Sequence, residues 1–257
     1  MSLKQCAVIG VGGIGKWHAK MMNDTGKCQV VALCDANEGL REWAAKEHPQ
    51  ARFYTHADDL FAKENLDLVA VVTPHNLHAP IAINALRHGI NVITEKPMAT
   101  SYQDALAMVA AAKAANRFVT VFHNRRLDPW FLAAKKAVTS GILGRIIELN
   151  TGINYGPSPQ TWRGFLAPSG GLQFDWGAHL VDYSLQLLGN DILWVSGSSY
   201  RRADKPADQV EDQAVTTIQF ASGAVARITA RALATVQPQR YHIVGEQGTL
   251  VDEWSWG

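Results

Sequence analysis

The chain has 257 residues, of which 47% are hydrophobic and 18% are charged, and its formal net charge is +1. This length allows one large domain or two smaller ones, each with a substantial core. The balanced charge argues against a disordered chain and against nucleic acid as a partner. Apolar stretches fall short of the roughly 18 residues of a membrane span, and the N-terminal one is too short for a signal peptide. The sequence therefore predicts a cytoplasmic protein with no membrane partner.

The three cysteines, Cys6, Cys28 and Cys34, lie in or beside predicted strands. Their number is odd, and they form neither a CxxC motif nor a metal-ligand spacing, so we expect reduced residues of the core.

Residues 4 to about 123 alternate short apolar runs with longer stretches of helical periodicity. This pattern is typical of a parallel sheet wrapped by helices, with strands buried on both faces. Helices are predicted at Leu77–His88, closed by Gly89, and at Ser101–Asn116, where Ser101 can act as N-cap. The predicted strands are Cys6–Gly10, Gln29–Asp35, a weaker Arg52–Thr55, Leu66–Val72, Asn91–Glu95 and Phe118–Phe122.

The pattern changes after residue 124 to a β-rich segment with few helices. Helices are predicted at Pro129–Ser140 and Leu172–Leu188. The predicted strands are Arg145–Ile153, Ile192–Tyr200, Gln213–Phe220, Ala224–Ala232 and Tyr241–Val244, with a hairpin turn at residues 221–223. We therefore predict an α/β chain with two domains. Residues 1–123 form a doubly wound parallel sheet, and residues 124–257 form an α+β domain with an open, mostly antiparallel sheet.

A glycine-rich motif follows the first predicted strand and opens a helix. It reads Gly10, Val11, Gly12, Gly13, Ile14, Gly15, which matches G-x-G-x-x-G. Asp35 closes the next strand 35 − 15 = 20 positions later, where an acid would bind a ribose 2′-hydroxyl. The motif alone also fits an ordinary turn, but in this context it predicts a dinucleotide cofactor on a Rossmann fold, held by the glycines, Ile14 and Asp35.

Asp35 also bears on the choice of cofactor. Its carboxylate would repel a 2′-phosphate, and the following residues 36–38 supply no Arg or Lys. NAD is therefore favoured over NADP. The alternative role for Asp35 is to cap a helix within a turn.

Two further strands end in polar residues at the sheet edge where α/β proteins bind ligands. Thr73-Pro74 follows one of them, with His75 and His78 close behind. The two histidines have an HxxH spacing but no third ligand nearby, so no metal site is predicted. Glu95-Lys96-Pro97 follows the other strand. A lysine at a buried strand end is costly unless it is functional or paired, and Glu95 is the alternative partner for Lys96.

The stretch GGLQFDWGAH places Asp175 and His179 four positions apart on a predicted helix. These residues could belong to a polar stripe, with Asp182 and Gln186, that faces water. The helix lacks the Lys and Glu of a solvated stripe, and Gly170, Gly171 and Gly177 allow a close approach to the backbone. These features weaken the water-facing alternative for Asp175 and His179, and Asp182 is expected to be a structural neighbour.

Taken together, these motifs resemble those of one family. The glycine motif with His18, Thr73-Pro74 with His78, Glu95-Lys96-Pro97, and Gly170-Gly171 with Asp175 and His179 occur in the order found in the Gfo/Idh/MocA oxidoreductases. This family includes glucose-fructose oxidoreductase and inositol dehydrogenase, and the resemblance runs from about residue 4 to 250. It implies a nicotinamide-binding Rossmann domain, a second domain whose open sheet forms a dimer or tetramer, and an active site between them.

The resemblance also implies roles for individual residues. Lys96, Asp175 and His179 correspond to the catalytic set. The further cofactor contacts are Thr73, Pro74, His78, Glu95 and Lys96. The candidate substrate contacts are Asn124, Arg125, Trp162 and Arg163. Family members usually continue for several tens of residues beyond the glycine turn at residues 245–248, so we expect a short second domain, either natural or truncated.

The implied reaction is hydride transfer between NAD(H) and a secondary alcohol or ketone of a sugar, cyclitol or polyol. His179 would take the hydroxyl proton, Lys96 would stabilise the alkoxide, and Asp175 would orient the substrate or the imidazole. The alternatives are a redox-neutral, NAD-dependent glycosidase that uses the same site, and a non-catalytic dinucleotide sensor or inactive paralogue. Trp130, Trp162 and Trp176 could stack on a sugar ring, although tryptophans more often belong to the core.

Overall fold

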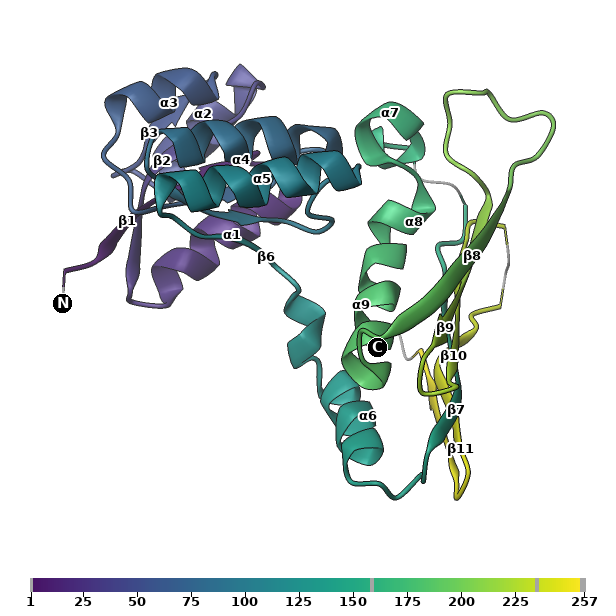
Figure 1. Ribbon diagram of the computed structural model, residues 1–257. Coiled ribbons are helices and arrows are strands. Elements are labelled where there is room, and N and C mark those ends of the chain that lie inside the picture. Colours follow the sequence, from purple (N-terminus) through teal and green to yellow (C-terminus); the bar gives the residue numbers. More distant parts are fainter. Residues whose placement is uncertain (1, 158–159, 234–235, 255–257) are drawn as a thin grey trace. The chain divides into compact units, whose positions relative to one another are not determined.

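The computed structural model describes residues 2–157, 160–233 and 236–254. The chain divides into two compact units, Met1–Phe122 (unit 1) and His123–Gly257 (unit 2). Each unit has its own sheet (Figure 1).

Unit 1 is built on a six-stranded sheet, sheet A, with the order β3-β2-β1-β4-β5-β6. Its strands are β1 (Lys4–Ile9), β2 (Cys28–Cys34), β3 (Arg52–Tyr54), β4 (Leu68–Val71), β5 (Asn91–Thr94) and β6 (Val119–Val121). Every neighbouring pair is parallel. This arrangement confirms the predicted doubly wound parallel sheet. The strand order reverses between β1 and β4, the point at which open α/β sheets bind ligands.

Helices pack against both faces of sheet A. They are α1 (Gly13–Asp24), α2 (Arg41–Glu47), α3 (Ala57–Lys63), α4 (His78–Arg87) and α5 (Tyr102–Ala115), with short 3₁₀ helices η1 (Glu38–Leu40) and η2 (His75–Leu77). One core includes Val8, Ala19 and Ala44, and a separate core includes Val71, Leu86 and Met108. The predicted N-cap of α5 is confirmed, because the Ser101 hydroxyl accepts a hydrogen bond from the Asp104 N–H.

The cysteines are unpaired thiols. Cys6 and Cys34 are buried and Cys28 is partly buried. Burial raises the pKa of the Cys34 thiol to about 12, so this group is protonated at neutral pH.

Unit 2 contains a second six-stranded sheet, sheet B, with the order β12-β11-β7-β10-β9-β8. Its strands are β7 (Ile146–Asn154), β8 (Ile192–Tyr200), β9 (Gln213–Phe220), β10 (Val225–Arg231), β11 (Gln239–Gly245) and β12 (Thr249–Glu253). Only the pair β10 and β7 is parallel, which confirms the open, mostly antiparallel sheet. Strand β12 was not among the predicted elements.

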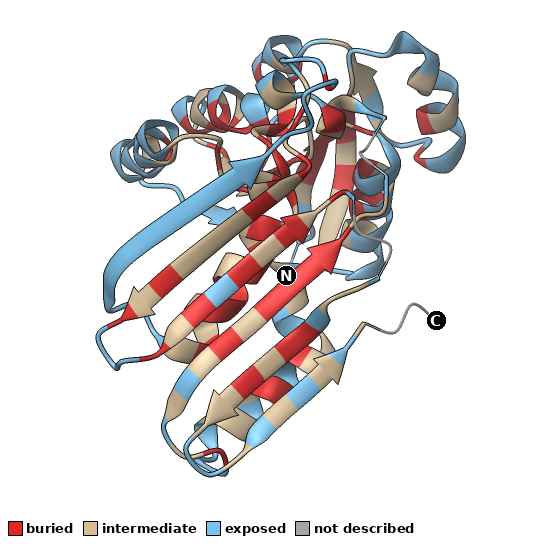
Figure 2. Cartoon of the chain, turned by 90° about the vertical axis from the view of Figure 1, so that its right-hand side faces the viewer, coloured by how far each residue is buried: buried red, intermediate tan, exposed pale blue. Residues whose placement is uncertain are grey.

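The helices of unit 2 lie on one face of sheet B (Figure 1). They are η3 (Asn124–Leu127), α6 (Pro129–Thr139), η4 (Trp162–Gly164), α7 (Leu166–Ser169), α8 (Leu172–Asp175) and α9 (Gly177–Leu188). Leu180 and Tyr183 of α9 pack with Leu149 of β7 and Ile228 of β10 in the core of the unit. Strand β8 is exposed along its whole length (Figure 2). Among the described residues, no helix is both long and apolar enough to cross a lipid bilayer.

The prediction of one helix over Leu172–Leu188 is wrong in one respect, because α8 and α9 are separate helices that meet at Trp176. The Trp176 N–H donates both to the Leu172 carbonyl and, over 2.8 Å, to the Tyr155 hydroxyl. The His179 N–H then bonds to the Trp176 carbonyl, only three residues earlier. The Tyr155 hydroxyl, from outside the helix, therefore competes with the Leu172 carbonyl for the Trp176 N–H at the junction of α8 and α9.

Candidate functional site

Four neighbouring strands of sheet A deliver polar or glycine residues to one edge. Gly10, Asp35, Thr73 and Glu95 come at or just after the ends of β1, β2, β4 and β5, which lie side by side in the order β2-β1-β4-β5. Because these strands are parallel, their carboxyl ends meet at the same edge of the sheet, as the sequence predicts.

The glycine loop combines tight packing with open space. A Cβ at Gly10 would lie 2.6 Å from the Val72 carbonyl oxygen, and one at Gly15 would lie 1.8 Å from the Gly10 carbonyl oxygen. Both positions therefore require glycine. Gly12 and Gly13 are exposed, and a Cβ at either would meet nothing within 4 Å.

The open part of this loop is the N-terminus of α1. Gly12 is the N-cap of this 12-residue helix, and the first turn carries no acidic side chain. Backbone N–H groups and the positive end of the helix dipole attract phosphate at such a position. The loop therefore fits the pyrophosphate of a dinucleotide.

Asp35 holds the glycine loop against the end of β2. Its carboxylate accepts hydrogen bonds from the Val11 N–H at 2.7 Å and from the Asn37 N–H at 2.9 Å. The Asn37 contact belongs to a turn, as the alternative role for Asp35 anticipates. Arg41, the first cation after Asp35 in the chain, pairs with Glu38 over 2.6 Å. Its charge is thus offset by a carboxylate, consistent with the preference for NAD.

His78 joins the loop after β4 to the loop after β5. It is fully buried, with Nε2 3.0 Å from the Thr73 carbonyl oxygen and Nδ1 2.8 Å from the Pro97 carbonyl oxygen. Burial lowers the pKa of His78, although the two carbonyls oppose this shift. Both ring nitrogens thus face the backbone, so His78 lies where it can position the cofactor loops. The nearby Thr73 hydroxyl is buried with no hydrogen-bond partner among the described residues.

Glu95 is paired with His18, a contact that the sequence did not predict. His18 Nε2 lies 2.8 Å from Glu95 Oε1, and Glu95 Oε2 accepts a hydrogen bond from the Lys96 N–H at 3.1 Å. Burial would raise the pKa of Glu95, but the His18 hydrogen bond and the nearby positive charges outweigh it and lower the pKa. The ionised carboxylate therefore links α1 to the loop that carries Lys96, which is itself partly buried.

In unit 2, Asp175 and His179 are each only 5% exposed. Asp182, on the same stripe of the helix, is 8% exposed, so the alternative of a water-facing stripe is wrong for these three residues. Asp182 forms a two-pronged ion pair with Arg126, at 2.8 and 2.5 Å, which gives it a structural partner.

Asp175 has a cation and a tyrosine beside it. Arg163 Nε lies 3.7 Å from Asp175 Oδ2, which brings together two of the predicted site residues. Burial, followed by the Asp175 charge, raises the pKa of Tyr155 well above its ordinary value. Tyr155 therefore stays protonated and its hydroxyl can act as a hydrogen-bond donor as well as an acceptor.

His179 lies among aromatic rings. Its ring centroid is 5.4 Å from that of Trp176, 6.3 Å from that of His123 and 6.5 Å from that of Tyr183. The Arg125 guanidinium lies 4.4 Å from the centroid of the Trp176 ring, and this places another predicted residue in the same neighbourhood.

The remaining predicted residues are less closely associated with this pair. The Arg163 guanidinium stacks 4.3 Å from the Trp162 ring centroid, whereas Asn124 lies exposed at the start of η3. Trp130 packs against the core of unit 2, under the guanidinium of Arg240. Its contacts therefore agree with the structural alternative for this tryptophan.

Sequence reasoning missed Tyr155, His123 and the partner role of His18. Tyr155 directly follows β7, so the rule that functional side chains cluster after strand ends could have found it. No group of three His, Cys, Asp or Glu residues within 2–157, 160–233 and 236–254 is placed to hold a metal ion.

Comparison with known proteins places the chain in a family. Residues 4–123 match the model of the oxidoreductase family with an NAD-binding Rossmann fold, and residues 131–251 match the Gfo/Idh/MocA C-terminal domain. The chain belongs to the Gfo/Idh/MocA oxidoreductase family. This assignment confirms the resemblance seen in the motifs, and it confirms NAD as the cofactor that unit 1 of this family member is built to bind.

Three relatives show the extent of the similarity. The uncharacterized oxidoreductase C115.03 of Schizosaccharomyces pombe is 33% identical over 63% of this chain, which spans 45% of that relative's length. The scyllo-inositol 2-dehydrogenase (NAD(+)) of Bacillus subtilis is 28% identical over 96% of this chain and 72% of its own. The WlbA dehydrogenase of Chromobacterium violaceum, in complex with NADH and UDP-GlcNAcA, has a TM-score of 0.87 at 26% identity, covering 97% and 73% of the two chains.

Proposed function

We propose that the protein is an NAD-dependent dehydrogenase that interconverts a secondary alcohol and a ketone on a sugar, cyclitol or related polyol. The observation that carries the proposal is the burial of Asp175 and His179, an acid and a base, in a chain whose other unit is an NAD-binding Rossmann domain. The similarity to an inositol dehydrogenase, and to a dehydrogenase bound to NADH and a sugar nucleotide, supports this substrate class.

The residues proposed to hold NAD lie along the carboxyl edge of sheet A. The open Gly12 and Gly13 would face the pyrophosphate, with Ile14 in the first turn of α1, and Asp35 would accept a hydrogen bond from the ribose. The unused hydroxyl of Thr73 and the adjoining Pro74, Glu95 and Lys96 complete the proposed set. When bound, NAD would supply the hydride acceptor.

The remaining chemistry is assigned to three side chains. His179 would take the proton of the substrate hydroxyl, because an imidazole titrates near neutral pH. The Lys96 ammonium would donate a hydrogen bond to the developing alkoxide. Asp175 would accept a hydrogen bond from the substrate, with the positive charge of Arg163 and the Tyr155 hydroxyl beside its carboxylate.

The test is a panel of cyclitols, polyols and sugars, with their keto forms and lactones, assayed with NAD(H) and NADP(H) by NADH absorbance. We expect net cofactor turnover with at least one member of the panel. The His179→Ala variant should lose about 10²- to 10⁴-fold in kcat while NAD affinity changes little. His88→Ala, which alters an exposed histidine at the end of α4, is the matched control.

Two other outcomes would overturn the proposal. Substrate conversion with no net change in NADH would indicate the redox-neutral glycosidase. Tight NAD binding with no conversion of any compound, unaffected by Lys96→Ala, would indicate a dinucleotide sensor or inactive paralogue.

We also propose that sheet B forms a dimer or tetramer interface. Its edge strand β8 exposes three apolar side chains: Leu193 is 66% exposed, Trp194 is 48% exposed and Val195 is 59% exposed. A long exposed apolar edge strand readily pairs with another chain. Light scattering should show an oligomer that Trp194→Lys weakens, and a monomer at micromolar concentration would refute the interface.

Localisation to the cytoplasm stays a prediction.

A further inference from the structure

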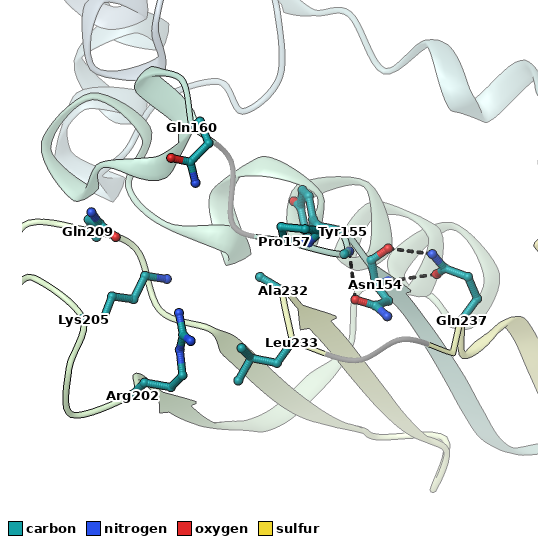
Figure 3. A pocket seen from close by; sticks show the side chains of 11 residues that line it. Asn154, Tyr155, Pro157, Gln160, Arg202, Lys205, Gln209, Ala232, Leu233 and Gln237 are labelled. Atoms are coloured by element: carbon teal, nitrogen blue, oxygen red, sulfur yellow. Dashed lines mark hydrogen bonds between the residues drawn. The ribbon is translucent and has the colours of Figure 1, made fainter.

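A cavity of about 620 Å³ opens in unit 2 beside the carboxyl end of β7 (Figure 3). Its walls come from the end of β7, the segment after β8 and the segment after β10. Its polar lining side chains are Asn154, Tyr155, Gln160, Arg202, Lys205, Gln209 and Gln237. This volume is within the roughly 300–1,000 Å³ range of small-molecule sites.

Two cationic side chains line the cavity. Arg202 and Lys205 extend into it (Figure 3), and among the described residues that line it there is no aspartate or glutamate. Asp212 forms an ion pair with each of these cations. Lys205 Nζ lies 2.8 Å from Asp212 Oδ1, and Arg202 Nε lies 3.7 Å from Asp212 Oδ2. One buried carboxylate therefore pairs with both cations.

Asp212 stays ionised, and its carboxylate holds the Lys205 ammonium and the Arg202 guanidinium. Burial would raise its pKa, but hydrogen bonds from the Lys205 ammonium and the Arg202 N–H outweigh burial and lower the pKa. The Lys205 side chain is almost fully enclosed, whereas that of Arg202 is 48% exposed. Arg202 is thus the cation that an incoming ligand can approach directly.

The opposite wall is fixed by hydrogen bonds. The Gln237 amide donates to the Asn154 carbonyl at 2.6 Å and accepts from the Asn154 N–H at 3.0 Å. This double contact holds the segment before β11 against the end of β7. The cavity is therefore bounded by secured backbone as well as by surface side chains.

Tyr155 connects the cavity with Asp175. It lines the cavity, and its hydroxyl accepts a hydrogen bond from the Trp176 N–H, the residue after Asp175. The charge of Asp175 contributes to the raised pKa of Tyr155, which shows that the two groups are close. Tyr155 therefore borders the cavity and also lies beside Asp175, one of the proposed catalytic residues.

We propose that this cavity is a subsite for an anionic group on the substrate, the carboxylate of a sugar acid or the phosphate of a sugar phosphate. The guanidinium of Arg202 suits a two-pronged contact with either anion, and Lys205 adds charge. The amides of Gln160 and Gln209 suit neighbouring hydroxyls. The assignment of the anion to a substrate rests on the proposed dehydrogenase function, whereas the binding itself does not.

Calorimetry on the full chain without cofactor tests the binding. The probes are glucuronate, glucose 6-phosphate and glucose, and we expect one or both anions to bind at least tenfold more tightly than glucose. The stronger of the two anions identifies carboxylate or phosphate. Arg202→Gln should remove the preference, Arg202→Lys should keep part of it, and Arg201→Gln, next in the chain but outside the cavity lining, should keep all of it. Equal binding of glucose and the anions, or an unchanged preference in Arg202→Gln, would overturn the proposal.

Turnover separates this inference from the proposed function. With an anionic substrate, Arg202→Gln should raise KM about tenfold with little change in kcat. Anion binding that depends on Arg202, without NADH turnover on any compound, would retain the subsite and reject the dehydrogenase. Turnover of neutral polyols without a preference for anions would retain the dehydrogenase and reject the subsite.

Discussion

Glu95 and His18 form a contact of 2.8 Å between residues 77 positions apart in the chain. His18 belongs to α1, the helix that begins at the glycine loop, and Glu95 precedes Lys96. Because an ionised carboxylate only accepts hydrogen bonds, His18 Nε2 carries the proton of this contact. The pair therefore fixes the Lys96 loop relative to α1, the helix whose N-terminus we propose to bind the cofactor.

Glu95→Gln should weaken this link. The variant keeps the shape of the side chain but loses its charge, so we expect the free energy of unfolding to fall by about 1–3 kcal/mol. Urea unfolding at neutral pH measures the loss. Glu246→Gln is the control, because its pair with Arg145 is exposed and should contribute less than about 1 kcal/mol. Equal losses in the two variants would contradict a stabilising role for the buried pair.

The same pair predicts a dependence of stability on pH. The pKa of Glu95 is lower in the folded protein than its usual value of about 4.3, so the unfolded chain binds the proton more readily. The stabilisation is therefore present above this value and is lost as the pH falls through the folded pKa. The difference in unfolding free energy between the wild type and Glu95→Gln should shrink on acidification, and a constant difference would refute this origin.

His78→Ala should destabilise unit 1 and disturb the carboxyl edge of sheet A, where NAD is proposed to bind. Removal of the buried imidazole leaves the Thr73 and Pro97 carbonyls without this partner, at a cost of about 2–4 kcal/mol. Thermal and urea unfolding measure the loss, and NAD titration measures the effect on the site. His88→Ala, an exposed change at the residue that directly follows α4, is the matched control. A His78→Ala protein as stable as this control would rule out the bridge as a structural element.

The glycine loop offers a pair of variants that separates folding from binding. Gly13→Ala adds a methyl group in open space, whereas Gly15→Ala places one against the Gly10 carbonyl. We expect Gly13→Ala to leave the unfolding transition almost unchanged and to weaken NAD binding through its contact with the pyrophosphate. Gly15→Ala should lower both stability and binding. Unchanged NAD affinity in Gly13→Ala would argue that the pyrophosphate lies elsewhere.

Asp35→Asn tests the choice of cofactor. The amide oxygen can still accept the Val11 hydrogen bond, but the negative charge is lost. We expect NAD to bind about tenfold more weakly and NADP to bind more tightly, because a 2′-phosphate is no longer repelled. Fluorescence titration with both cofactors measures the ratio. Asp59→Asn, an exposed aspartate on α3, is the control, and an unchanged ratio in Asp35→Asn would refute the role of the charge.

The features of the fold that could be predicted from the sequence are those that depend on the spacing of residues close together in the chain. The glycine motif and Asp35 reveal the first parallel strands, because each signal lies within one β-α-β segment. The helix break at Trp176 depends on Tyr155, 21 residues away, which no periodicity records. Strand β12 pairs with β11 alone at the edge of sheet B, and its partly exposed residues leave a weak apolar signal. The His18–Glu95 pair arises only when distant segments meet in the fold.

The position of β7 within sheet B has a consequence for the order of folding during synthesis. In sheet A, β1 ends at Ile9 and its first partner, β2, begins at Cys28, 28 − 9 = 19 residues later. In sheet B, β7 ends at Asn154 and its first partner, β10, begins at Val225, 225 − 154 = 71 residues later. Contacts between such distant segments form slowly. During synthesis, β7 leaves the ribosome long before β10 and β11, the strands it pairs with, have been made. Unit 1 can therefore fold before the central strand pair of unit 2 can form.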